Sequence, residues 1–250
     1  MKLMFCMFAE DIHLLDQELF TKILKSSKIA PARLSQKLHG LFKAMTTGGD
    51  YGADTIRHFN GGLFHDAEVI DLTLDEIAEL IEIADYDWSN VEPSIFGTLF
   101  ERILDPDKRS QIGAHYTGKE DILTLLEPVL MAPLRREWEE VRAKADAAYL
   151  KIQEAARKTP RKVGIARKES KERVAFNKIL GDFLNRLAHV KVLDPSCGSG
   201  NFLYMSLKLL LDLEKEVITY GSSRGFSRFP HVEPTQLLGI EINPYAQQLA

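Results

Sequence analysis

Apolar positions at helical spacing dominate the first half of the chain. Leu3–Leu15 is apolar on most sides. Asp16 is expected to cap a helix over Gln17–Lys25, because an Asp side chain can accept hydrogen bonds from the free N–H groups of a first helical turn. Pro31 can open the next helix, through Met45, since its fixed φ suits the first helical position.

The same pattern continues to about residue 107. Thr73 or Asp75 can cap a helix through Ile83, and Pro93 can open another helix, through Leu104. No stretch here alternates apolar and polar residues long enough to predict a strand. We therefore expect a mainly helical first domain.

The next part of the pattern indicates two long helices with a basic segment between them. Leu134–Ala156 is highly charged with few apolar positions, and a second helix is expected from about Glu169 to Ala188. The second helix carries an apolar stripe formed by Val174, Phe176, Ile179, Leu180, Phe183, Leu184 and Leu187. The basic residues of the connecting segment are Arg157, Lys158, Arg161, Lys162, Arg167 and Lys168. The pattern favours a solvated helical hairpin; the alternative is an arm that contacts DNA phosphates.

From Val190 the pattern becomes α/β. Val190–Leu193 predicts a short buried strand, a glycine-rich turn follows, and Phe202–Leu213 predicts an apolar helix. A strand, a glycine turn and a helix in this order let backbone amides approach a ligand and direct a helix N-terminus towards it.

Composition and charge limit the class of protein. The 250 residues are 45% hydrophobic and 27% charged with a net charge of −4, as in ordinary globular domains. Residues 1–107 hold 9 Lys/Arg against 19 Asp/Glu and the remainder holds 23 against 17, so the later part permits a polyanionic partner. The apolar N-terminus is interrupted by Glu10 and Asp11, unlike a signal peptide, and no apolar stretch is long enough to span a bilayer. The only cysteines, Cys6 and Cys197, offer neither a disulfide framework nor zinc-ligand spacing, so a cytoplasmic location is expected.

The string at residues 193–203, Leu-Asp-Pro-Ser-Cys-Gly-Ser-Gly-Asn-Phe-Leu, resembles motif I of S-adenosylmethionine-dependent DNA amino-methyltransferases. The resemblance implies that Asp194 holds the methionine end of the cofactor and that the glycines let the backbone pass beneath it. It assigns cofactor contacts to Asp194, Pro195, Gly198, Ser199, Gly200, Asn201 and Phe202. The alternative is a tight turn in an unrelated α/β domain.

A second strand is expected over Leu237–Asn243, and Glu241 can accept hydrogen bonds from both ribose hydroxyls at its end. Its neighbour Ile242 is included among the cofactor-binding residues. Glu241 comes about 40 residues after Gly200, later than in a compact dinucleotide site, and an inserted loop at Gly221–Thr235 explains the excess. The alternative is a charge at the strand end that faces water.

Gly113–Gly118 precedes an expected helix over Glu120–Leu130 and resembles motif X of the same enzymes. The resemblance implies that Tyr116 forms an apolar wall and that Thr117 presents its hydroxyl and amide to the cofactor carboxylate. Thr117 is also expected to cap the helix, with Glu120 completing a capping box. His115 is interpreted as a pocket or turn residue, and Cys197 as a small packed residue in the glycine turn.

Asn243-Pro244-Tyr245 is similar to the Asn-Pro-Pro-Tyr motif in which amino-methyltransferases hold the target amine. The tripeptide lacks one proline and directly follows the expected ribose-binding strand, so we assign it to motif II. No Asn-Pro-Pro occurs elsewhere in the 250 residues. We therefore assign no catalytic residue, and no metal ligand.

The order of motifs X, I and II resembles that of gamma-type, adenine-specific DNA methyltransferases. The whole chain is similar to the MmeI-like (YeeA-like) modification enzymes of restriction–modification and phage-exclusion systems. The matching segments are 8–11 (FAED), 59–64 (FNGGLF), 95–101 (IFGTLFE) and 113–117 (GAHYT). Because family members carry more on both sides, we expect a fragment that is inactive alone.

The resemblance implies three parts and a mainly α spacer followed by the start of a Rossmann-like class I methyltransferase domain. The parts are a spacer at 1–107, a motif X entrance with the basic arm at 108–189, and the first half of the cofactor domain at 190–250. The implied cofactor is S-adenosylmethionine, the partner is double-stranded DNA, and the acceptor is the exocyclic amine of adenine. Two alternatives stay open: a methyltransferase acting on protein or a small molecule, and a non-catalytic helical interaction module with a vestigial cofactor fold.

Overall fold

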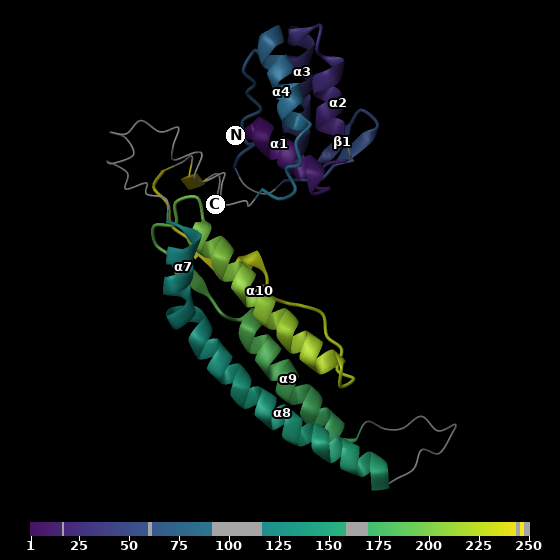
Figure 1. Ribbon diagram of the computed structural model, residues 1–250, viewed down its shortest axis with the longest axis vertical. Coiled ribbons are helices and arrows are strands. Elements are labelled where there is room, and N and C mark those ends of the chain that lie inside the picture. The colour runs from purple at the N-terminus through teal and green to yellow at the C-terminus, as the bar shows by residue number, and fades with distance from the viewer. Residues whose placement is uncertain (17, 60–61, 92–116, 159–169, 244–245, 248–250) are drawn as a thin grey trace, which may run out of the picture. The chain divides into compact units, whose positions relative to one another are not determined.

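The computed structural model describes residues 1–16, 18–59, 62–91, 117–158, 170–243 and 246–247 (Figure 1). Its contacts divide the chain into two compact units. The first is Met1–Tyr116 with Gly198–Gly200 and Glu241–Ala250, and the second is Thr117–Cys197 with Asn201–Ile240. Among the described residues no helix has the length and apolar character needed to cross a membrane. The helix predicted from Pro93 to Leu104 lies outside the described residues.

The first unit contains the helices α1 (Lys2–Asp11), α2 (Leu19–Ser26), α3 (Pro31–Thr47) and α4 (Leu74–Ala84). Its described part therefore confirms a helical region. One prediction was wrong, because β1 (Gly49–Tyr51) and β2 (Asp54–Ile56) form an antiparallel hairpin. Each strand has only three residues, too few for alternation to be visible in the sequence, and the turn depends on Gly52 at φ 65°.

The core of this unit combines the helices with a cluster of phenylalanines. Four phenylalanine rings pack edge to face or tilted against one another, and the ring centroids in three of the pairs lie 5.4–5.8 Å apart. The four are Phe5, Phe42, Phe59 and Phe64. The largest fully buried side chains around them are Phe20, Leu24, Leu34, Leu38, Leu41, Met45 and Ile77. The segment at 59–64 thus supplies two of the core aromatics.

Two helix caps were predicted in the first unit; one is confirmed and the other was wrong. Thr73 caps α4 in a capping box with Glu76, as predicted, and Asp75 does not cap it. Asp16 was a wrong prediction, since the N-cap of α2 is Glu18 in the left-handed region and has no side-chain capping bond. The amides of that first turn are instead satisfied from α1, by Glu10.

The second unit begins with one continuous helical run. α7 (Lys119–Leu126) passes through a π-helical turn, η1 (Glu127–Met131), into α8 (Ala132–Lys158). The wider turn contains Pro128, which has no backbone N–H to give to a regular helix. The predicted cap of α7 was wrong, because Gly118 rather than Thr117 is the N-cap and no side-chain capping bond forms.

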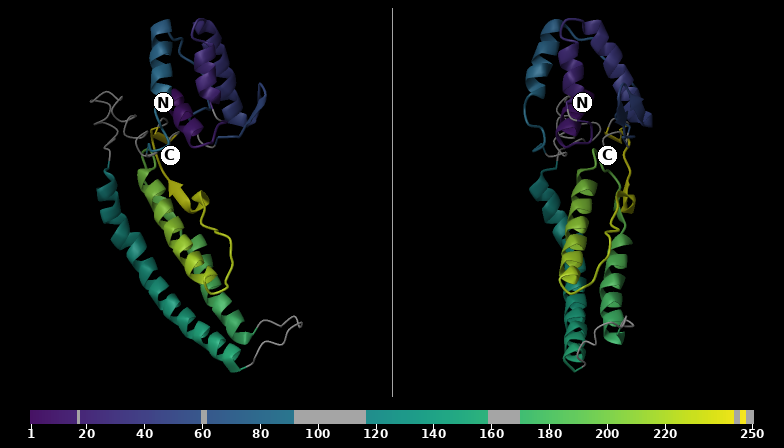
Figure 2. Two further views of the ribbon diagram at one scale, coloured as in Figure 1. Left: turned by 45° about the vertical axis from the view of Figure 1, so that its right-hand side comes forward. Right: turned by 90° about the vertical axis from the view of Figure 1, so that its right-hand side faces the viewer.

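The predicted helical hairpin is confirmed. α9 (Lys171–Ala188) lies along α8, and α10 (Asn201–Ser222) packs beside them (Figure 2). Trp138 of α8 stacks on Phe183 of α9 with ring centroids 5.5 Å apart, and Tyr220 of α10 meets the same indole edge-on. The stripe was wrong at Val174, which is half-exposed because it lies on the first turn of α9, before the buried positions begin at Phe176.

The α/β pattern is also confirmed, with shifted boundaries. β3 (Val192–Asp194) and β4 (Leu237–Gly239) pair in parallel, joined by α10 and the short 3₁₀ turn η2 (Pro234–Gln236). The prediction of a buried strand was wrong at Leu193, which is 58% exposed. Leu193 pairs with the half-exposed Leu238, and among the described elements α10 covers only the opposite face of the pair.

Candidate functional site

The glycine turn between β3 and α10 is the centre of the candidate site. Asp194 ends β3, and its Oδ1 accepts the N–H of Ser196 at 3.0 Å. Gly198 and Gly200 have φ values of 55° and 85°, in the left-handed region where a residue with a side chain is strained. The sequence therefore needs glycine at both positions to turn the chain from the strand into the helix.

Backbone hydrogen bonds connect the start of this turn with the end of β4. The N–H of Ile240 donates to the carbonyl oxygen of Asp194 at 2.9 Å, and the N–H of Cys197 donates to the carbonyl oxygen of Ile240 at 3.0 Å. Cys197 itself is buried, as expected for a packed residue in the turn. These bonds continue the parallel pairing of β3 with β4 and fix the position of the start of the turn.

Glu241 directs its carboxylate to the backbone. Its Oε2 accepts the N–H of Gly198 at 2.8 Å, and its Oε1 accepts the N–H of Asn243 at 2.7 Å. This geometry disfavours the alternative of a charge that only faces water. A carboxylate oxygen can accept more than one hydrogen bond, so both oxygens keep capacity for hydroxyl donors.

Gln236 fixes where β4 begins. Its side-chain amide donates to the carbonyl oxygens of Leu187 and Val190, at 2.8 and 2.9 Å, and its Oε1 accepts the N–H of Glu233 at 2.9 Å. These bonds tie the entry of β4 to the end of α9 and the start of the β3 segment. Sequence reasoning missed Gln236, because a glutamine before a strand carries no signal of burial.

A buried carboxylate holds the loop that precedes Gln236. Glu214 of α10 is 1% exposed, and its oxygens accept the N–H groups of His231 and Val232 at 2.6–3.2 Å. This bond set returns the chain from the end of α10 to β4. The inserted loop inferred from the spacing is therefore anchored, and it delivers Glu241 to the strand end despite its length.

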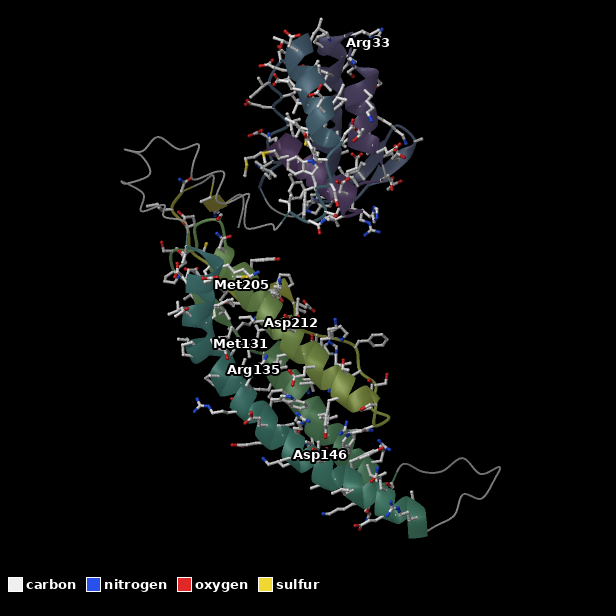
Figure 3. All side chains as sticks on the ribbon, in the orientation of Figure 1. Arg33, Met131, Arg135, Asp146, Met205 and Asp212 are labelled. Atoms are coloured by element: carbon white, nitrogen blue, oxygen red, sulfur yellow. The ribbon has the colours of Figure 1, made fainter. Side chains whose placement is uncertain are left out.

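The helix that follows the motif X segment packs on the helix that follows motif I. Ile122 and Leu126 of α7 form a buried cluster with Met205 of α10, and Phe202 packs partly buried against it. Met205 is labelled in Figure 3. Thr117, two residues before the start of α7, belongs to the same unit as Asp194. Tyr116 and His115 lie outside the described residues.

Two features of the turn test whether it fits a cofactor. The Oγ of Ser199 is buried and has no hydrogen-bond partner among the described residues, so it is open to a ligand. A Cβ placed on Gly198 would meet nothing within 4 Å, which leaves open space over the backbone. With the carboxylate of Glu241, which belongs to the same unit, these groups fit a ligand that carries hydroxyls. The remaining predicted contacts are Pro195 and Ile242, which are exposed, and Asn201, which is half-buried.

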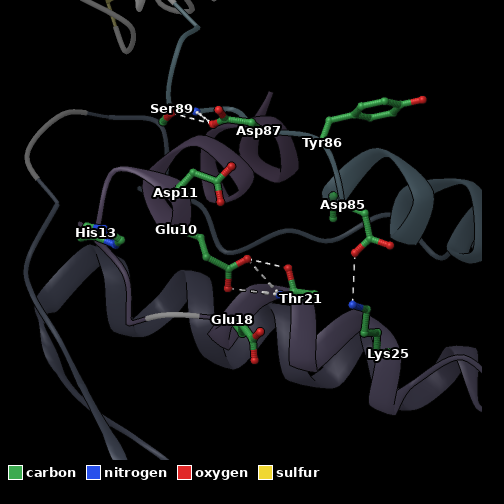
Figure 4. Close-up of a pocket in the computed structure, with 11 residues that line it drawn as sticks. Glu10, Asp11, His13, Glu18, Thr21, Lys25, Asp85, Tyr86, Asp87 and Ser89 are labelled. Atoms are coloured by element: carbon green, nitrogen blue, oxygen red, sulfur yellow. Dashed lines mark hydrogen bonds and ion pairs between the residues drawn. The ribbon is translucent and has the colours of Figure 1, made fainter.

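An acidic pocket of about 530 Å³ lies in the first unit (Figure 4). Glu10 on its wall accepts the N–H groups of Phe20 and Thr21 and the hydroxyl of Thr21. Asp11 accepts the N–H of Trp88, and Lys25 pairs with Asp85. Because these groups hold backbone amides or each other, we assign the pocket to the fold. The segment at 8–11 that resembles the MmeI-like family is thereby given a structural role.

Comparisons with known proteins match both ends of the chain. Residues 166–250 match the family model described as the DNA-methyltransferase domain of MmeI, and residues 1–64 match the MmeI helicase spacer domain. A solved structure of the type IIL restriction–modification enzyme MmeI in complex with DNA matches 99% of the chain, with 26% identity and a TM-score of 0.71. Both family models describe domains of MmeI, so the chain is similar to MmeI-like proteins near both of its ends.

Two curated relatives are also described as methyltransferases. DNA methyltransferase A of Bacillus subtilis is 24% identical across the whole chain, and a putative type II restriction enzyme and methyltransferase of Methanocaldococcus jannaschii is 28% identical over 86% of it. The chain spans 26% and 20% of the lengths of these two relatives, and 31% of the MmeI chain.

Proposed function

We propose that this chain is the S-adenosylmethionine-binding part of a site-specific DNA methyltransferase in a restriction–modification or phage-defence system. The observation that carries the proposal is the left-handed glycine turn at Gly198–Gly200, which combines the unpartnered hydroxyl of Ser199 with an amide bonded to Glu241. The similarity of residues 166–250 to the DNA-methyltransferase domain of MmeI supports the same assignment.

The proposed roles follow from the donor and acceptor types. Asp194 accepts from the ammonium group at the methionine end, and Glu241 accepts from the ribose hydroxyls. Gly198 and Gly200 keep the backbone close, while Ser199 and Thr117 offer hydroxyls. When bound, the cofactor supplies the methyl group; the residues of this chain hold and orient it.

The proposed acceptor is the exocyclic amine of adenine in double-stranded DNA. The order of motifs X, I and II supports an amino-methyltransferase, and the related MmeI was solved with DNA. We place two runner-up functions below it: methylation of a protein or small molecule, and a helical interaction module that has lost cofactor binding. Motif X argues against the first of these, and titration with S-adenosylmethionine separates the second.

Calorimetric titration with S-adenosylmethionine tests the proposal. Asp194→Ala and Glu241→Ala should each weaken binding about ten- to a hundredfold, because a hydrogen bond to a charged partner contributes roughly 1.5–3 kcal/mol. Asp212→Ala and Glu140→Ala are matched controls, since both side chains are exposed on helices, and they should bind as the wild type. Equal affinity of all four variants, with folded circular dichroism spectra, would remove the assignment.

A further inference from the structure

Gly239 of β4 lies so close to Cys197 that a side chain at residue 239 has no free space. A Cβ built on Gly239 would lie 2.7 Å from the Sγ of Cys197, 3.0 Å from the Cδ1 of Leu203 and 3.3 Å from the Cβ of Cys197. Gly239 has no positive φ, so the requirement for glycine here is one of space and not of backbone conformation. Any side chain at residue 239 would force the side chains of Cys197 and Leu203, or the backbone that carries them, to shift.

The residues on either side of this contact carry the bonds that shape the turn. Cys197 donates its N–H to Ile240, the residue after Gly239, and the next amide, that of Gly198, donates to Glu241. Leu203 lies in the first turn of α10. A side chain at residue 239 would therefore displace segments that lead directly to the amide of Gly198 and the carboxylate of Glu241, which the proposed function uses.

We propose that Gly239 and Cys197 are positioning residues of the cofactor site, matched in size so that the turn seats directly on β4. This inference rests on the proposed function, because it concerns the same site. It adds that the affinity for S-adenosylmethionine depends on the summed size of two side chains that do not touch the cofactor. Misplacement of a binding group by about 1 Å can cost a factor of up to a hundred.

A size exchange tests the proposal. Gly239→Ala should weaken S-adenosylmethionine binding at least tenfold in calorimetric titration, and the double variant Cys197→Gly/Gly239→Ala should return to within about threefold of the wild type. The Cys197→Gly change removes both the Sγ and the Cβ that the new methyl group would meet. Gly181→Ala is the matched control: it makes the same change in α9, where the neighbouring atom is the movable guanidinium of Arg228.

Amide hydrogen exchange in the absence of cofactor gives a second readout. The N–H of Gly198, protected by Glu241 in the wild type, should exchange faster in Gly239→Ala and regain protection in the double variant. A merely structural role would lower the unfolding temperature and affinity together, without restoring this one amide. If Gly239→Ala does not fold, the double variant decides the matter alone.

The outcomes are separable. Wild-type affinity in Gly239→Ala, or a folded double variant that binds no cofactor while the wild type does, overturns the size-matching proposal alone. Absence of binding by the wild type overturns the proposed function, and this inference with it. Weaker binding by Gly239→Ala with recovery in the double variant supports both.

Discussion

Glu10 of α1 is buried against the first turn of α2, and only 7% of its surface is exposed. Its two oxygens accept the amide of Phe20 at 2.8 Å, the amide of Thr21 at 3.3 Å and the hydroxyl of Thr21 at 2.6 Å. Burial raises the pKa of this carboxyl, and the three hydrogen bonds act against that rise. Glu10 therefore substitutes for a local N-cap at the cost of a partly desolvated charge.

We predict that Glu10 makes the first unit more stable in mild acid. A carboxyl whose pKa is higher folded than unfolded binds protons more readily in the folded state, so its contribution to stability is complete below the unfolded pKa and is lost as pH rises through the folded pKa. Chemical denaturation of the wild type from pH 7 towards pH 5 should show this gain. Glu10→Gln, which keeps an acceptor oxygen, should lack it.

The variant Glu10→Ala tests the capping role of Glu10 separately from the effect of its charge. Removing the side chain leaves the amides of Phe20 and Thr21 without acceptors and should lower stability by about 1–3 kcal/mol. Glu79→Ala, on the exposed surface of α4, is the control for loss of an acidic residue. A Glu10→Gln variant with an unchanged pH profile would show that another group titrates.

At the scale of elements, helices with full apolar stripes were predicted closely, the strands β3 and β4 were predicted with shifted boundaries, and the β1–β2 hairpin was missed. The stripe from Phe176 to Leu187 fixed α9 within two residues, because a helix of this length repeats its pattern several times. β3 and β4 have three residues each and depend on long-range partners such as the amide of Gln236. Their boundaries shifted for that reason.

The candidate site shows the same division. The glycines at 198 and 200 are visible in the sequence because left-handed backbone selects glycine locally. The close approach of Gly239 to Cys197 could be found only from the structure, since the two residues are 42 positions apart in the sequence. The bond from Gly198 to Glu241 likewise joins segments that are distant in the chain.

The connection between α8 and α9 carries the prediction about DNA. Arg157 is exposed near the end of α8, and the basic residues from Arg161 to Lys168 lie outside the described residues. We propose that this arm contacts phosphates. Changing Arg157, Lys158, Arg161 and Lys162 to Gln should then flatten the plot of log binding constant against log salt, by about 0.9 for every phosphate that the variant no longer neutralises.

A control of equal charge makes this test specific. Changing Lys22, Lys28, Arg33 and Lys43 to Gln removes the same charge from exposed positions of the acidic first unit and should leave the slope as in the wild type. Fluorescence anisotropy with a mixed-sequence duplex measures the slope. A salt range of about 50–200 mM is suitable, because DNA-binding proteins lose much of their affinity across it. Equal slopes in both variants would assign the arm to a solvated hairpin.

At the scale of the whole chain, residues 1–107 and the remainder differ in charge and in their family matches. Residues 1–107 are acidic and include the spacer match, whereas the basic remainder includes the methyltransferase match. A polyanion is therefore more strongly attracted to the part that carries the cofactor turn. This asymmetry supports the DNA partner that we propose for the second part.

Transfer to adenine requires a flipped base whose amine faces the methyl group. The only Asn-Pro-Tyr in the chain begins at Asn243, whose Oδ1 accepts the N–H of Ala246 at 3.3 Å and whose own N–H donates to Glu241 at 2.7 Å. Those bonds are the local ones of a residue that caps the following helical turn at 246–247. We predict that these 250 residues, expressed alone, transfer no methyl group to DNA even when they bind S-adenosylmethionine. Incorporation of tritiated methyl groups into mixed-sequence DNA measures this directly, with calorimetric binding of the cofactor to the same sample as the control. Incorporation above background that disappears in Asn243→Ala would place catalysis at this residue and overturn its assignment to motif II.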